Sequence, residues 1–450
     1  MEKSILKISA LCASILLITG CARGSGGNSS GESVTPGTTV VKMSLMNSVN
    51  ENDGWFAMID KANELLASEH IKIETEIIQT DEWDKYYTKV ASNMAGRVGG
   101  TIGRIAESHI PLMINKKQVQ DLTSVYESLD MSKYNASAFE GVAKNNGHYY
   151  GLPTGAQHMV LYYNKDAIDN YNASHDDKIS YPSSDWNNPT SFEELKDMAF
   201  KLSSGVRPNR KFGLSAGPFL AYGGMYAKSL GGDNIFKNDG TSAIDSDQYR
   251  TVYKWFDDMI KVDQSMPKPT DTTIESSMDQ FYAGNIAMAI DGVWWLNNVM
   301  NPKIVDFNVG IAAVPTGVKG SKSYSSVFTD CFFAVANSKH PEEDKKAIKA
   351  LMQVESIKAV AEKGVGGIPV ANDAVSSFTK SLEQKFSTND ITCLTDGTTH
   401  TLHVPYTTYY NSVDQKINQK MPVWLNGELT SDQFVAYMHE TLTDAINKNK

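Results

Sequence analysis

Two adjacent tryptophans, Trp294 and Trp295, are the residues best suited to bind a flat ligand. They follow an apolar run and an Asp291-Gly292 pair in the stretch IAMAIDGVWWLNN, residues 286–298. A tryptophan offers a large aromatic surface, but it is also a common component of protein cores. Successive residues of a helix point about 100° apart, so both rings cannot face one ligand squarely. At least one of the two rings could therefore lie open to a ligand; burial of both in the core is the alternative.

Patterns typical of catalysis are missing from the rest of the sequence. It contains no Walker loop and no HExxH, GxSxG or complete EF-hand pattern. His400 and His403 lie three apart near Cys393, but their polar neighbours indicate a loop rather than a metal site. We therefore expect no catalytic residue, cofactor or metal. The 52 acidic residues still leave room for a glycosidase-type carboxylate pair, which no spacing selects.

Composition bounds the class of protein. The chain has 450 residues, of which 41% are hydrophobic and 21% charged, and this predicts a globular protein of two or three domains. Its formal net charge is −10, and it has no long Lys/Arg cluster. Such a surface argues against a nucleic-acid partner.

The N-terminus has the features of a targeting segment. Lys3 and Lys7 precede an apolar stretch that is too short to span a bilayer, and residues 18–21 read ITGC. This ending resembles the lipobox of bacterial lipoproteins, which implies cleavage before Cys21, its lipidation, and anchoring on the extracytoplasmic face of the cell membrane. The alternative is an ordinary secretory signal with an incidental cysteine. The Gly/Ser/Thr-rich residues 22–39 should form a flexible tether.

Two cysteines remain after the signal and the lipidated residue are set aside. They are Cys331 and Cys393. They could form a disulfide in an oxidising compartment, or both could be buried thiols, because sequence does not determine their separation.

An alternation of strands and helices follows from residue 40. Residues 40–47 and 71–78 alternate as strands, and residues 55–70 between them have helical periodicity. A second helix is expected to end at Gly96. This pattern predicts an α/β fold with open, mostly parallel sheets. The faces expected to be buried contain Phe56, Ile59 and Leu66 in the first helix, and Trp83, Tyr87, Val90 and Met94 in the second.

Later helices carry clear start signals. Ser191 and Glu194 have capping-box spacing, as do Thr430 and Gln433, and Pro341 suits the first position of a helix.

The order of several stretches resembles the extracellular solute-binding proteins of carbohydrate ABC importers, the family of maltose-binding protein. The resemblance extends from about residue 40 to 447. One departure is the stretch GRVGGTIGRIAESH, residues 96–109, which lacks the Pro-Asp pair usual in relatives on this side of the ligand site. The matching stretches are NNGHYYGLPTGAQHMVLYYNKDAI, LGGDNIF, SMDQFYAGNIAMAIDGVWWLNNV, FNVGIAAVPTG, FAVANSKHPEEDKKAIKALM and GVGGIPV.

This resemblance implies a two-lobed periplasmic-binding-protein-like fold with a hinge that the chain crosses more than once. The function it implies is capture of a sugar or oligosaccharide between the lobes by a monomer that delivers it to ABC permease subunits. A secreted glycoside hydrolase, or an importer receptor for a non-sugar solute such as a peptide or sugar phosphate, remains the alternative. A phosphate would need Arg or Lys, and the loops of the expected site offer only Arg104. The expected lobes are 40–157 with 284–329, and 158–283 with 330–450.

The resemblance also implies the ligand contacts. An aromatic ring can cover the apolar face of a pyranose while polar side chains bind its hydroxyls. The family's D-G-x-W tryptophan corresponds to Trp294, so the resemblance implies that Trp294 stacks on the sugar and that Trp295 assists or packs beside it. The resemblance implies seven further contacts, each of which could equally have a structural role: Gln157, Glu107, Phe219, Tyr222, Trp55, Asp330 and Tyr410.

Overall fold

The computed structural model describes residues 37–48, 51–80, 82–139, 144–207, 209–271 and 277–449. Residues Thr39–Lys450 form one compact unit. Cys21, the signal segment and nearly all of the expected tether lie outside the described residues, so these features stay predictions. No described helix combines the length and apolar character needed to cross a bilayer.

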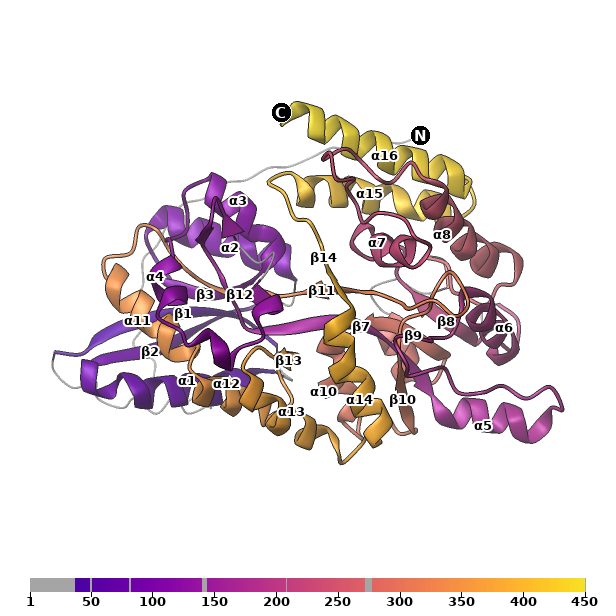
Figure 1. The fold of residues 1–450 in the computed structure, drawn as a ribbon, viewed down its shortest axis with the longest axis horizontal. Helices are drawn as coiled ribbons and strands as arrows, with labels where there is room; N and C mark the ends of the chain where they lie inside the picture. Colours follow the sequence, from indigo (N-terminus) through magenta and orange to yellow (C-terminus); the bar gives the residue numbers. More distant parts are fainter. Residues whose placement is uncertain are drawn as a thin grey trace, which may run out of the picture. The chain divides into compact units, whose positions relative to one another are not determined.

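The first lobe is built on a five-stranded sheet with strand order β2-β1-β3-β12-β6. β1 runs parallel to β2 and β3, whereas β12 runs antiparallel to β3 and β6. In Figure 1, helices α2 and α3 lie above this sheet and α1 and α12 lie below it. The elements are β1 (Thr39–Met46), α1 (Asn52–Leu66), β2 (Ile71–Ile78), α2 (Trp83–Gly96), β3 (Ile102–Ala106), α3 (Ile110–Asn115), α4 (Thr123–Glu127), β6 (Leu152–Pro153), β12 (Asp330–Ala334), α11 (Pro341–Leu351) and α12 (Val354–Ala361).

The two faces of this sheet contribute to separate hydrophobic clusters. Cys331 and Phe333 of β12 pack with α2 and α3, while Phe332 and Ala334 belong to the cluster that contains α1. Alternate residues of a strand point to opposite faces, so one short strand contributes to both cores.

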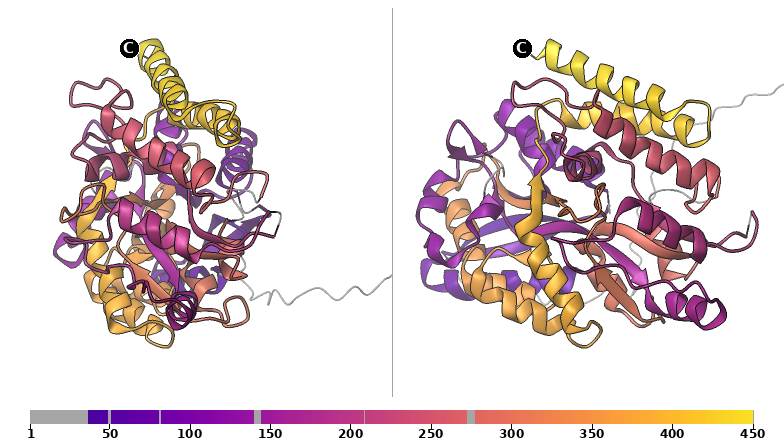
Figure 2. Two further views of the ribbon diagram at one scale, coloured as in Figure 1. Left: turned by 90° about the vertical axis from the view of Figure 1, so that its right-hand side faces the viewer. Right: turned by 45° about the vertical axis from the view of Figure 1, so that its right-hand side comes forward.

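The second lobe is built around β7, a ten-residue strand whose residues are all buried. Its sheet has the order β14-β11-β7-β9-β8, and β10 and β13 also pair with β7. Figures 1 and 2 show α15 and α16 lying beside α8 at one end of this lobe. The elements are β7 (Gly155–Asn164), α5 (Lys165–Ser174), α6 (Phe192–Leu202), β8 (Phe212–Ala216), α7 (Leu220–Ser229), α8 (Asp247–Asp257), α9 (Ser277–Tyr282), β9 (Ile286–Gly292), α10 (Leu296–Met300), β10 (Val309–Ala312), β11 (Ser325–Phe328), β13 (Ile368–Pro369), α13 (Val375–Leu382), α14 (Thr388–Gly397), β14 (Thr401–His403), α15 (Tyr410–Leu425) and α16 (Ser431–Lys448). A separate hairpin joins β4 (Lys144–Asn145) to β5 (His148–Tyr149).

The described strands show three crossings of the chain between the two sheets. The chain passes from β6 to β7, from β11 to β12, and once more between β12 and β14. The first two crossings are joined, because the backbone N–H of Thr154 donates to the Asp330 carbonyl at 2.9 Å and the Thr154 hydroxyl to the same oxygen at 3.1 Å. Glu107 is tied to the second crossing by its backbone N–H, which donates to the Thr329 carbonyl at 3.1 Å.

The α/β two-lobed architecture is confirmed, but the sheets are mixed rather than mostly parallel. The expected lobe boundaries also need correction. β9, β10 and β11, which lie in 284–329, pair within the β7 sheet and belong to the second lobe, whereas β12 of 330–450 belongs to the first. The physical reason is that β7 takes partners on both edges, and pairing between distant strands leaves no mark in the local pattern.

Both early helices form where predicted, although their buried faces differ in detail. Trp55 is 2% exposed while Phe56 is 36% exposed, so Trp55 rather than Phe56 belongs to the core of α1. In α2 the fully buried tyrosine is Tyr86, not Tyr87. The helix ends at Gly96, as predicted, and Arg97 closes it in the left-handed conformation.

The predicted helix starts are confirmed. Both capping boxes form at the N-termini of α6 and α16, and Pro341 occupies the first turn of α11.

Candidate functional site

A cavity of about 890 Å³ lies where the two lobes meet. Its volume is near the upper end of the range of about 300–1,000 Å³ for small-molecule sites. The two hinge residues Thr329 and Asp330 also contribute to its wall. The first lobe provides Ser48, Glu51, Thr80, Trp83, Arg104 and Glu107, among others, and the second provides Gln157, Tyr222, Trp294, Trp295, Asn297 and Phe328, among others.

The second-lobe side of the cavity is aromatic. Trp294 lies in the turn between β9 and α10, and its ring meets Phe328 edge to face with centroids 5.5 Å apart. Phe328 meets Tyr222 at 5.7 Å, and Tyr222 meets Phe219 at 5.4 Å, again edge to face. Such contacts hold each ring at a defined angle. The half-buried Trp294 is thus fixed as part of the cavity wall.

Trp295 lines the same cavity but packs on a different neighbour from Trp294. It is half-buried, and its ring meets Tyr282 of α9 edge to face at 6.4 Å. Both tryptophans therefore reach the cavity, and the alternative that both are buried in the core is wrong.

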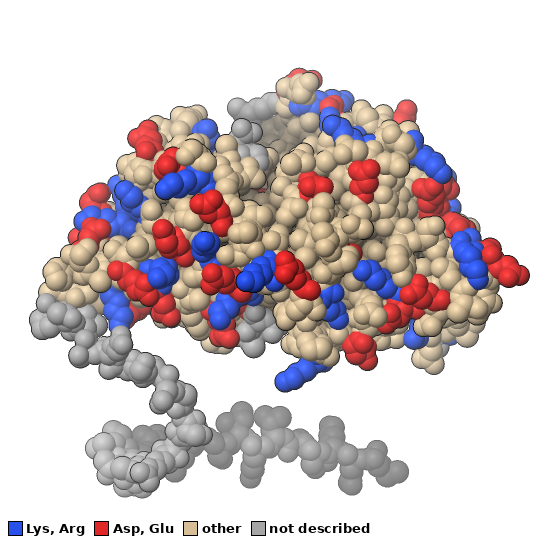
Figure 3. Space-filling view, turned by 60° about the horizontal axis from the view of Figure 1, so that its bottom comes forward, with Lys and Arg blue, Asp and Glu red and all other residues tan. Residues whose placement is uncertain are grey.

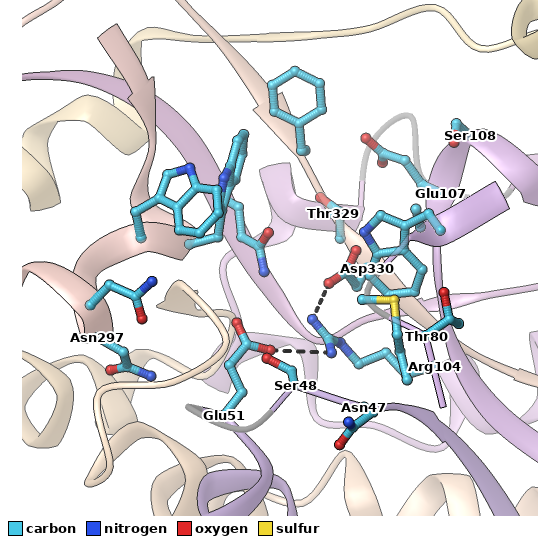
Figure 4. Close-up of a pocket in the computed structure, with 18 of the residues that line it drawn as sticks. Asn47, Ser48, Glu51, Thr80, Arg104, Glu107, Ser108, Asn297, Thr329 and Asp330 are labelled. Atoms are coloured by element: carbon cyan, nitrogen blue, oxygen red, sulfur yellow. Dashed lines mark hydrogen bonds and ion pairs between the residues drawn. The ribbon is translucent and has the colours of Figure 1, made fainter. Parts of the chain in front are cut away.

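The first-lobe side of the cavity contains a network of charged side chains. Arg104 of β3 binds the carboxylate of Asp330, and its Nη1 lies 3.5 Å from Glu51 Oε2. Figure 4 shows both interactions as dashed lines. Burial opposes the charge of Arg104, but Asp330 and Glu51 outweigh this effect and raise the pKa of Arg104 above its ordinary value.

Aromatic rings surround the Arg104 guanidinium. It lies 4.2 Å from the ring centroid of Trp55 and 5.3 Å from that of Trp83. The indole N–H of Trp55 also donates to Glu51 Oε2 at 3.2 Å. The cation is thus held by two carboxylates and two rings, which stabilises its charge in a largely dry environment.

Glu107 is the second charged feature of this wall. Its side chain is buried, and the Oε1 atom has no hydrogen-bond partner among the described residues. Burial raises the pKa of Glu107 well above its ordinary value; a backbone hydrogen bond with Thr329 opposes this shift and the charge of Asp330 adds to it. In Figure 4 Glu107, Thr329 and Asp330 gather on one side of the pocket, and Asn297 lies on the other.

Asp291 lies next to the aromatic wall. Its Oδ1 accepts the Gly292 backbone N–H at 2.7 Å. Burial raises the pKa of Asp291 to about 7, against this hydrogen bond, which favours the charged form. The carboxyl group therefore titrates near neutral pH.

Six of the nine predicted contact residues line the cavity: Trp294, Trp295, Gln157, Glu107, Tyr222 and Asp330. They come from β3, β7, β9, β12 and α7 or from the turns beside them, so the resemblance located the site from widely separated segments. Whether they bind a ligand stays a prediction.

The remaining three predicted residues do not line it. Trp55 packs in the core behind Arg104, and Phe219 supports Tyr222 from outside the wall. Tyr410 is 5% exposed and lies behind Tyr406, with the two rings 4.7 Å apart. The aromatic residue that reaches the cavity from this segment is Tyr406.

Sequence reasoning missed several other lining residues. Asn297 is three residues after Trp294, a spacing that places both on one side of a helical turn and could have identified it. Phe328 directly precedes the hinge crossing. Glu51 and Trp83 gave no separate signal, because their role depends on where Arg104 is placed.

The remaining candidates for chemistry do not form a site. Cys331 and Cys393 are both buried free thiols, Cys331 in the first lobe and Cys393 in the second. His400 stacks on Trp186 at 5.7 Å. The part of the chain that the structure describes contains no group of three or more His, Cys, Asp or Glu residues able to hold a metal ion.

The sequence is similar to a family of binding proteins and to several of its curated members. The profile of the bacterial extracellular solute-binding proteins matches residues 49–356. A maltotriose-binding protein of Pyrococcus abyssi is 27% identical over 226 residues, which cover 50% of this chain and 42% of that protein. A maltooligosaccharide ABC transporter solute-binding lipoprotein of Streptococcus pneumoniae is 26% identical over 259 residues, 55% of each chain. The chain thus spans about half the length of the curated relatives it matches.

Solved structures match over nearly the whole chain. An ABC substrate-binding protein from Listeria monocytogenes, in complex with cycloalternan, has a TM-score of 0.77 at 17% identity and covers 91% of this chain and 99% of its own. The maltose/maltodextrin-binding domain from Bdellovibrio bacteriovorus, bound to maltotriose, has a TM-score of 0.71 at 17% identity and covers 91% and 100%. At this identity the likeness establishes the two-lobed fold.

Proposed function

Because the chain belongs to the family of bacterial extracellular solute-binding proteins, we propose that it captures a sugar or oligosaccharide for an ABC importer. The observation that carries this proposal is the composition of the cavity. Aromatic rings of Trp294, Phe328 and Tyr222 form one side, and carboxylate, hydroxyl and amide groups line other parts of the cavity. A pyranose needs both, since its C–H face packs on a ring while its hydroxyls require hydrogen bonds.

In this proposal, the two lobes close on the ligand by rotation about the hinge. The cavity is lined from both lobes, and the chain crosses between them at Thr154, at Thr329 and once more between β12 and β14. Rotation about these few residues would close the lobes around a ligand without disturbing either sheet. The closed monomer would then deliver its ligand to the permease subunits.

Anchoring by a lipid on Cys21 completes the proposal. The ITGC ending of the apolar segment supports it, as does the description of the pneumococcal relative as a lipoprotein. A tethered receptor remains near its membrane partner on the extracytoplasmic face.

A thermal-shift screen of the purified protein against a carbohydrate panel tests the function. Binding to the folded state raises the melting temperature by mass action, so a sugar ligand should produce a concentration-dependent rise. Oligopeptides and sugar phosphates in the same screen test the non-sugar alternatives, and chromogenic glycosides test hydrolysis. Stabilisation by peptides alone, or turnover of a glycoside, would contradict the proposal.

A further inference from the structure

The wall of the cavity has an excess of acidic side chains. Glu51, Glu107 and Asp330 line it, and Arg104 is the only Lys or Arg among the described lining residues. By contrast, basic and acidic side chains are interspersed over the face shown in Figure 3. The excess of acidic side chains is therefore local to the cavity wall, where a bound ligand would contact it.

The one cation of the wall is already engaged. Arg104 binds Asp330, approaches Glu51, and lies against the rings of Trp55 and Trp83. Its side chain is 5% exposed. A negatively charged ligand would therefore have to displace existing partners of Arg104 before it could pair with the guanidinium.

Unlike Arg104, Glu107 is not fully paired, because one of its carboxyl oxygens has no hydrogen-bond partner among the described residues. The residue is 5% exposed, it lines the cavity, and Oε1 is buried without a hydrogen bond to any described group. Among the described residues, Glu107 interacts electrostatically with Asp330, Cys331 and Tyr406, which are acidic groups. A buried carboxyl oxygen without a donor is costly, and a donor on the ligand would remove that cost.

We propose that Glu107 gives the cavity its charge selectivity by pairing with a hydrogen-bond donor of the ligand. An amino sugar binds more tightly than its hydroxyl analogue, and a sugar acid is excluded. This inference rests on the proposed function and specifies its substrate class. An ammonium group supplies a strong donor and the positive charge that stabilises an ionised Glu107. A carboxylate would instead lie near Glu51 and Asp330 in a poorly hydrated site whose one described cation, Arg104, is already engaged.

The test uses matched sugars that differ in one substituent. Isothermal titration at pH 7 compares glucose, galactose and mannose, each with its 2-amino form and its uronic acid, and also compares cellobiose with the chitosan disaccharide. Binding is measured for the parent, for Glu107→Gln, and for the control Glu362→Gln, which makes the same chemical change at an exposed position outside the cavity.

We expect at least one amino sugar to bind about 10-fold more tightly than its neutral analogue in the parent and the control, with no binding of the uronic acids. In Glu107→Gln the amino preference should disappear while the neutral sugar still binds. Titrations in buffers of different ionisation enthalpy should show proton release with the amino sugar and none with the neutral sugar, because pairing with an ammonium ionises Glu107.

Equal affinity for all members of a matched set, or an amino preference that survives in Glu107→Gln, would overturn the inference and leave the proposed function standing. If no sugar in the set or in the wider carbohydrate panel binds, both fail together.

Discussion

The six-membered ring of Trp294 lies directly against the Cα of Gly292, so closely that a β-carbon at position 292 would collide with it. The backbone of Gly292, at φ −83° and ψ 160°, is one that any residue adopts. Glycine is therefore required here by the tryptophan ring and not by backbone strain.

Gly292→Ala should displace the Trp294 ring and weaken ligand binding with little change in fold. We expect a loss of about 10-fold in affinity, corresponding to ~1.4 kcal/mol, for the sugar identified in the thermal-shift screen. The control is Gly96→Ala, where the added carbon would meet only Val98 at 3.5 Å. Unchanged affinity in Gly292→Ala would show that the ring position is unimportant for binding.

Trp294→Ala should affect binding more than stability. Loss of a stacking ring is worth on the order of 1–3 kcal/mol, or about 10–100-fold in affinity, while the unliganded melting temperature should change little. The matched variant is Trp295→Ala, which loses the packing on Tyr282 and should lower stability more than affinity. The assignment is reversed if Trp294→Ala melts early and binds normally, since truncation of a core tryptophan costs roughly 3–5 kcal/mol.

Arg104→Met should destabilise the protein strongly. The substitution keeps much of the side-chain length but leaves Asp330 and Glu51 without their cation, and breaking a buried ion pair in this way costs about 3–5 kcal/mol. Urea unfolding measures the loss. The double variant Arg104→Met/Asp330→Asn should recover part of it, because one unpaired charge is then removed. A parent-like free energy of unfolding in the single variant would show that the network is not stabilising.

Asp291 should make stability depend on pH. Its pKa is raised from the ordinary value to about 7 in the folded protein, so folding binds a proton at intermediate pH. The stabilisation is present at low pH and is lost as pH rises from about 4 through 7. Asp414, whose burial raises its pKa to about 6, acts in the same direction. The melting temperature of the unliganded protein should therefore contain a contribution that decreases between pH 5 and pH 8.

Asp291→Asn isolates this contribution. The amide keeps an acceptor for the Gly292 N–H but does not titrate, so the decrease between pH 5 and pH 8 should be smaller than in the parent. Asp60→Asn, at an exposed position of α1, is the matched control and should follow the parent. Identical pH profiles for the parent and Asp291→Asn would rule out this role of Asp291.

Cys21→Ser tests the membrane anchor. An attached acyl chain contributes about 0.8 kcal/mol per buried methylene to membrane binding, and the variant cannot carry one. We expect the variant to appear in the medium or to remain an unprocessed precursor, whereas the parent fractionates with membranes. Mature Cys21→Ser protein in the membrane fraction would contradict lipidation.

Local sequence determined the elements of this protein well. The capping boxes at Ser191 and Thr430 and the helix start at Pro341 depend on contacts within a few residues, and all form as predicted. The alternating pattern of residues 71–78 also predicts the strand that forms there, although this strand pairs with β1. The order of the family motifs also located Trp294, Gln157 and Asp330 in one cavity. The helix-start signals are carried by neighbouring residues, and the family motifs are recognised by their residues and their order along the chain, so both can be read without knowing the fold.

Only the tertiary structure decided how distant segments combine. Strand pairing assigns 286–328 to the second lobe, because β9, β10 and β11 find their partners in or beside β7. Pairing of β3 with β12 also brings Arg104 close to Asp330, which is 226 residues away in the sequence. Packing of α1 on the sheet directs Trp55 toward Arg104 and not into the ligand cavity. Such contacts depend on which buried surfaces and charges meet after folding. Neither the period of a helix nor the spacing of a motif contains that information.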